Sequence, residues 1–214
     1  MSIRWNWRLA SRLSVLSLAV LVVIFVLVYQ RVSADKASSI DTPSVTTSGL
    51  QGTDLGGATA PGFTLIDQHG KTVSLADFKG QPVVVTFMFT RCPDQCPLEA
   101  QKLHSTFQLL GNDASHVTML AISTDPQNDT PQAASNFTQA HSLDQSNWHF
   151  LTGSSQQLSP VWSNYHVYAN SNGNTADHSL GIYVLDKQGH ERVFQDTSFT
   201  PDQLASNLKK LLSE

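Results

Sequence analysis

Cysteine is scarce in this sequence. The chain has 214 residues and only two cysteines, Cys92 and Cys96. Because neither stands near the apolar N-terminal segment, the pattern of a lipid-modified cysteine behind such a segment is absent. Clusters of lysine and arginine are also lacking beyond that segment, which argues against a basic face for nucleic acid. No internal repeat is present, and the length suits one ordinary domain with additional segments.

Charge is absent from residues 13–29, which are almost wholly apolar. A helix of roughly 17–25 apolar residues is long enough to cross a bilayer. Arg4, Arg8 and Arg12 precede this run, and every acidic residue follows it. The positive-inside rule therefore predicts a single-pass anchor with a cytoplasmic N-terminus, residues 1–12, and with the remaining chain across the membrane.

A cleaved signal peptide is the alternative for the same segment. Val32, Ser33 and Ala34 include the small residues that a signal peptidase accepts. Both interpretations deliver the rest of the chain to the same side of the membrane. Residues 30–57 are rich in Ser, Thr, Asp and Gly, so they are predicted to be a flexible linker. The folded domain is expected to span residues 58–214.

Hydrophobic periodicity beyond the linker predicts strands that alternate with helices. Two stretches, 83–89 and 117–123, are almost continuously apolar, as expected of strands covered on both faces. An antiparallel hairpin is predicted near the end of the chain, followed by a last helix with Thr200 as its N-cap and Pro201 in its first turn. This order is typical of an α/β sandwich with a mixed central sheet. The predicted strands are 63–66, 72–75, 83–89, 117–123, 148–151, 180–186 and 191–195, and the predicted helices are 97–110, 131–141, 155–165 and 201–212.

Cys92 and Cys96 stand where a buried strand gives way to a helix, the end at which α/β folds place ligand chemistry. The positive end of the helix dipole and the neighbouring Arg91 favour a thiolate, so we expect depressed thiol pKa values. Asp94 is expected to cap the helix. The pair is compatible with a metal site, a redox couple or a structural disulfide, and two sulfurs alone leave a metal short of ligands.

Among eight histidines, His178 is the best candidate for a third ligand. It precedes the predicted strand 180–186, and in a thioredoxin-like topology the start of that strand faces the cysteine loop. Thioredoxin-type redox proteins usually have two residues between their cysteines and a cis-proline opposite them. This chain has three residues between its cysteines and no proline between Pro160 and Pro201.

Three segments resemble the signatures of the Sco/SenC family: "FTRCPDQCP" from residue 89, "STDPQNDTP" from residue 123 and "DHSLGIYVLDKQG" from residue 177. These proteins are membrane-anchored, thioredoxin-like copper proteins that help to assemble the copper A centre of cytochrome c oxidase. By this resemblance Cys92, Cys96 and His178 match the family's copper ligands. Asn128, Lys187 and His166 depart from it, because arginine, proline and glycine are frequent at these positions.

The resemblance implies a thioredoxin-like copper metallochaperone that carries Cu(I) or Cu(II) and is not itself an enzyme. Its expected partners are the oxidase subunit with the copper A site and a copper donor protein. The expected location is a bacterial inner membrane, with the domain on the periplasmic side. One alternative is a thiol–disulfide oxidoreductase in which Cys92 and Cys96 form a redox-active pair, and a structural disulfide is another. The ligand types are also compatible with zinc.

Overall fold

The computed structural model describes residues 21–26, 49–169 and 181–214. The chain divides into two units, residues 1–42 and 43–214. In the first unit, residues 21–26 are helical and belong to the predicted anchor, whose other residues lie outside the described part. Within the described ranges, no helix is both long and apolar enough to cross a bilayer.

The second unit is built on a six-stranded sheet with the strand order β1-β8-β7-β4-β5-β6. The strands β4, β5 and β6 are parallel, whereas β7 pairs with β4 in the antiparallel sense. The mixed central sheet predicted from the sequence is therefore confirmed. The strands are β1 (Thr53–Asp54), β4 (Val83–Met88), β5 (Thr118–Ser123), β6 (Trp148–Leu151), β7 (Gly181–Leu185) and β8 (Glu191–Asp196).

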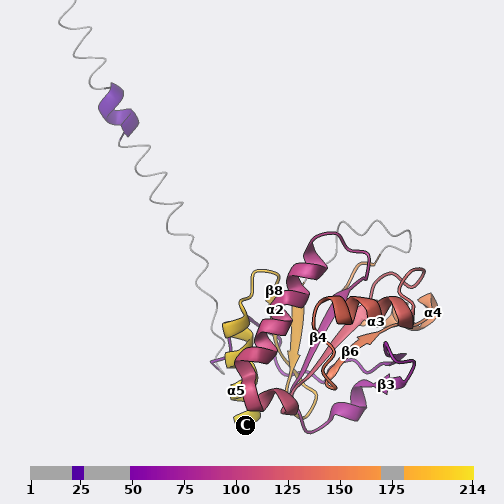
Figure 1. Cartoon of the computed structure of the whole chain (residues 1–214). Coiled ribbons are helices and arrows are strands. Elements are labelled where there is room, and N and C mark those ends of the chain that lie inside the picture. Colours follow the sequence, from indigo (N-terminus) through magenta and orange to yellow (C-terminus); the bar gives the residue numbers. More distant parts are fainter. Residues whose placement is uncertain (1–20, 27–48, 170–180) are drawn as a thin grey trace, which may run out of the picture. The chain divides into compact units, whose positions relative to one another are not determined.

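Helices cover both faces of the sheet (Figure 1). On one face, α2 (Gln95–Leu110), α3 (Pro131–Ala140) and α5 (Pro201–Ser213) share a hydrophobic core with alternate residues of β4 such as Val84 and Met88. The other face has a second core, which includes Val85 and Phe87 of the same strand. That core is closed by α4 (Ser155–Asn164), the hairpin of β2 (Thr64–Ile66) and β3 (Thr72–Ser74), and the 3-10 helix η1 (Leu75–Phe78). A second 3-10 helix, η2 (Gly111–His116), follows α2.

The folded unit includes residues that the sequence analysis assigned to the linker. Leu50 is fully buried in the core beneath α5, and β1 pairs with β8. The Asn207 side chain on α5 both donates to and accepts from the backbone of Gln51, each at 2.8 Å. The fold thus starts before residue 58. The sequence did not reveal this earlier start, because the segment is rich in Ser, Thr and Gly and its two-residue edge strand is too short to show a periodicity.

Candidate metal centre

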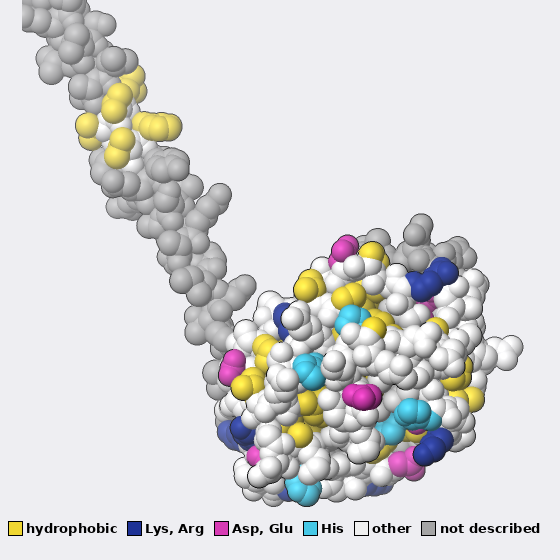
Figure 2. All heavy atoms as spheres, in the orientation of Figure 1, with side chains coloured by type: hydrophobic (Ala, Val, Ile, Leu, Met, Phe, Trp, Pro, Cys, Tyr) yellow, Lys and Arg dark blue, Asp and Glu magenta, His cyan; other side chains and the backbone are white. Residues whose placement is uncertain are grey.

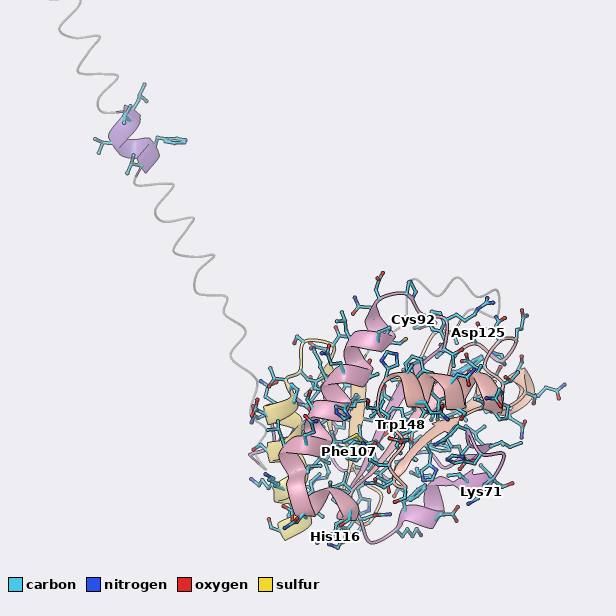
Figure 3. All side chains as sticks on the ribbon, viewed as in Figure 1. Lys71, Cys92, Phe107, His116, Asp125 and Trp148 are labelled. Carbon is cyan, nitrogen blue, oxygen red and sulfur yellow. The ribbon has the colours of Figure 1, made fainter. Side chains whose placement is uncertain are left out.

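The two cysteines lie at the carboxyl end of β4. Cys92 is half-buried in the loop that follows the strand, and Cys96 is the second residue of α2. Figure 3 shows Cys92 and Asp125, which follows β5, at one end of the sheet, with His116 at the opposite end. The parallel pairing of β4 with β5 explains this placement, because parallel strands end at the same edge.

A short turn brings Cys92 to the N-terminus of α2. The backbone N–H of Cys92 donates to the carbonyl of Phe89 at 3.2 Å. The N–H of Cys96 then points at the Sγ of Cys92, with 3.3 Å between nitrogen and sulfur. The sulfur of Cys92 therefore sits at the positive end of the helix dipole, as predicted. Cys92 itself lies before the helix, so the two cysteines do not share one helical turn.

Two expectations about this loop are wrong. Burial raises the pKa of the Cys96 thiol far above its ordinary value, and the neighbouring Cys92 raises it further. The expected depression fails for Cys96 because its side chain is only 1% exposed, so desolvation of the thiolate outweighs the helix dipole. Asp94 occupies the N-cap position, but its side chain makes no capping hydrogen bond. Both cysteines are free thiols in this structure.

Glu99 is a buried carboxyl group one turn beyond Cys96 on α2. It accepts a hydrogen bond from the hydroxyl of Thr86 on β4. Burial raises the pKa of Glu99 to about 7, although the Thr86 hydroxyl and the positive charge of Lys102 oppose the change. Glu99 is not among the site residues predicted from the sequence. The signal that identifies it is an acidic residue on the apolar face of a core helix, three residues after Cys96.

A second buried carboxyl group, that of Asp129, lies between β5 and α3. It accepts hydrogen bonds from Ser123 and from Thr90, which is two residues before Cys92. Burial raises the pKa of Asp129, and these hydrogen bonds partly offset the effect. The "STDPQNDTP" segment thus contacts the cysteine loop, which the sequence motif alone did not reveal.

The structure accommodates the three residues that depart from the family pattern. Asn128 donates from its side-chain amide to both carboxylate oxygens of Asp125, at 3.0 and 2.7 Å. Lys187 donates to the carbonyl of Leu212 at 2.7 Å, near the end of α5. His166 has a φ of 55°, a conformation in which glycine is favoured, which is the physical reason for a glycine at this position.

His178 lies outside the described residues, so its relation to the two sulfurs is a prediction that the structure does not test. The strand that follows it, β7, begins at Gly181, where a Cβ atom would approach the carbonyl oxygen of Gln195 to 2.5 Å. Among the described residues, no group of three or more His, Cys, Asp and Glu side chains is arranged to hold a metal ion. In Figure 2 the histidines on the drawn face are scattered, and acidic and basic side chains are interspersed.

The fold and the dithiol loop agree with the comparison to known families. The SCO1/SenC family model matches residues 51–213, which is nearly the whole of the folded unit. The chain belongs to the SCO1/SenC family. The resemblance predicted from the three sequence segments is therefore confirmed.

Individual relatives show the extent of the similarity. Protein sco1 of Schizosaccharomyces pombe is 34% identical over 146 residues, which are 63% of this chain and 52% of that protein. A structure of ScoI from Bradyrhizobium japonicum with copper bound is 32% identical, with a TM-score of 0.63 over 72% of this chain and 100% of that one. BsSco, described as a member of the Sco family of cytochrome c oxidase assembly proteins with a disulfide switch, is 27% identical, with a TM-score of 0.65 over 76% and 97% of the two chains. The chain spans just over half the length of the first curated relatives that it matches.

Proposed function

We propose that this protein binds copper through Cys92, Cys96 and His178. The observation that carries the proposal is a free dithiol at the carboxyl end of β4 in a chain of the SCO1/SenC family. Thiolates are soft ligands that select Cu(I), and imidazole suits copper in either oxidation state. Two sulfurs and one nitrogen make a three-coordinate set that leaves room for an incoming ligand from a partner.

Copper delivery by ligand exchange is the function that this site supports best. Cys92 is partly exposed whereas Cys96 is buried, so a partner protein would meet the Cys92 sulfur first. The relative BsSco is described as belonging to a family of cytochrome c oxidase assembly proteins. We therefore propose the oxidase subunit with the copper A site as the recipient and a separate copper protein as the donor.

Thiol–disulfide exchange is a second candidate function. The same two features that suit copper, an accessible sulfur at a helix N-terminus and a buried partner sulfur, also suit a redox-active pair. The disulfide switch described for BsSco favours keeping this alternative. In this role Cys92 would attack a target disulfide and Cys96 would then displace the target from the mixed disulfide.

The location is proposed from the sequence. Residues 13–29 would anchor the protein in a bacterial inner membrane, with residues 1–12 in the cytoplasm and the folded unit on the periplasmic side. An intact mass of the membrane-extracted protein is expected to include the N-terminal segment. A mass that begins after Ala34 would show cleavage and contradict the anchor.

Metal titration of the reduced, full-length protein tests the proposed function. One equivalent of copper is expected to bind, and Cys92→Ser, Cys96→Ser and His178→Ala are each expected to weaken binding strongly. His116→Ala is the matched control, because this exposed histidine lies at the opposite end of the sheet (Figure 3). Failure of the wild type to bind copper, or full retention by all three variants, would end the proposal. A protein that reduces disulfides but binds no copper would favour the oxidoreductase.

A further inference from the structure

The cysteine loop is held from outside by one buried carboxylate. Asp129 is 3% exposed and lies between β5 and α3. Its Oδ1 accepts from the backbone N–H of Thr90 at 2.9 Å and from the hydroxyl of Thr90 at 2.6 Å. Two donors of a single residue thus meet one carboxylate oxygen. This contact joins two loops that are 39 residues apart in the sequence.

The other carboxylate oxygen is anchored to the end of β5. Oδ2 of Asp129 accepts from the hydroxyl of Ser123 at 2.6 Å. The same Ser123 oxygen accepts from the backbone N–H of Asp125 at 3.1 Å. All three groups around Asp129 are donors, which an ionised carboxylate accepts without a conflict. When Asp129 is ionised, it accepts all three hydrogen bonds, and the hydroxyls of Thr90 and Ser123 both donate to it.

Thr90 connects the hydrogen bonds of Asp129 to the turn that contains Cys92. It is the second residue of the turn that the Cys92 N–H closes onto the carbonyl of Phe89. On the near side of the turn, the N–H of Thr124 donates to the carbonyl of Met88 at 3.0 Å, which continues the β4–β5 pairing. The turn is thus pinned at its start by the sheet and at Thr90 by Asp129. Cys92, two residues after Thr90, is the last residue of the turn, and its sulfur accepts from the N–H of Cys96 at the N-terminus of α2.

We propose that Asp129 and Thr90 are positioning residues for the copper site, a role that rests on the proposed function. Neither residue would contact the metal. Their hydrogen bonds fix the turn before copper arrives, so the sulfur of Cys92 needs no reordering when it binds. Groups that orient metal ligands in this way typically change metal affinity by about 10–100-fold when they are removed. Preorganisation lowers the entropic cost of binding in the same sense.

Thr90 offers a matched pair of substitutions that separates positioning from general stability. Thr90→Val keeps the shape of the side chain and the backbone N–H but removes the hydroxyl that donates to Asp129. Thr90→Ser keeps the hydroxyl and removes only a methyl group. Thr90 is half-exposed in a loop, so neither change opens a cavity in the core.

The experiment measures Cu(I) affinity by competition with a chromophoric Cu(I) chelator, on the reduced full-length protein and both variants. We expect Thr90→Val to bind about 10-fold more weakly and Thr90→Ser to bind like the wild type. Urea unfolding of the metal-free proteins runs in parallel. The proposal is supported when the loss of affinity in Thr90→Val is rescued by serine.

Three outcomes overturn the inference. Equal affinities of the wild type and Thr90→Val would show that the hydroxyl does not position the ligand, while copper binding itself would stand. Equal weakening by valine and serine would show that keeping the hydroxyl does not restore affinity, so the hydrogen bond to Asp129 would not be what positions the ligand. A wild type that binds no copper would instead remove the proposed function, and the positioning role with it.

Discussion

Glu99 makes the stability of the folded unit depend on pH in a direction that can be worked out. Its side chain is buried between α2 and β4, and burial raises its pKa from 4.5 to about 7. The folded state therefore holds a proton that the unfolded chain has already released between these two pH values. Stability from this group is fully present below about pH 4.5 and is lost as the pH rises to about 7.

The substitution that tests this is Glu99→Gln, which has nearly the shape of the protonated acid and keeps an oxygen to accept from Thr86. One pKa unit corresponds to about 1.4 kcal/mol. The free energy of unfolding of the glutamine variant, relative to that of the wild type, should therefore rise by about 3 kcal/mol between pH 4 and pH 8. At pH 4 the two proteins should be nearly equal in stability. Comparing the two proteins cancels the titration of all other groups.

Urea unfolding of the reduced, metal-free, full-length protein at several pH values supplies the measurement. Thr86→Val adds a second test, because it removes the hydroxyl that favours the ionised form of Glu99. Its own loss of stability with rising pH should exceed that of the wild type. A difference between Glu99→Gln and the wild type that stays constant from pH 4 to pH 8 would refute the reasoning.

Two further predictions concern the copper site and the start of the fold. The oxidised protein should bind Cu(I) poorly, because a disulfide offers no thiolate; equal binding by the oxidised and reduced forms in a Cu(I) competition assay would contradict this. Leu50→Ala should lower the free energy of unfolding by about 2–5 kcal/mol, since Leu50 is fully buried. Leu98→Ala, at a position 54% exposed, is the control and should change it by less than about 0.5 kcal/mol; equal losses would show that residue 50 is not part of the core.

The regular elements of the fold were predictable because each has a local signature. The continuous apolar runs became β4 and β5, and Thr200 does cap α5, as its position before Pro201 predicted. The short strand β1 was missed, since its two residues are defined by pairing with β8 and carry no pattern of their own. Long-range pairing of this kind is a tertiary effect that propensity does not encode.

The placement of the two cysteines was predictable from the sequence, whereas their surroundings were less so. Cys92 and Cys96 were placed at the carboxyl end of the strand by the change from apolar run to helix. The raised pKa of Cys96 was not foreseen, because helix position is visible in the sequence whereas the depth of burial is not. The same holds for Asp129 and Thr90, which meet only after β4 and β5 have paired.

X-ray absorption spectroscopy at the copper edge tests the proposed ligand set most directly. The reduced, full-length protein loaded with one Cu(I) is predicted to show two sulfur donors and one nitrogen donor. Cys92→Ser should lose one sulfur, and His178→Ala should lose the nitrogen. A copper ion with no sulfur donors, or a spectrum that is identical in the wild type and both variants, would contradict a site built from Cys92, Cys96 and His178.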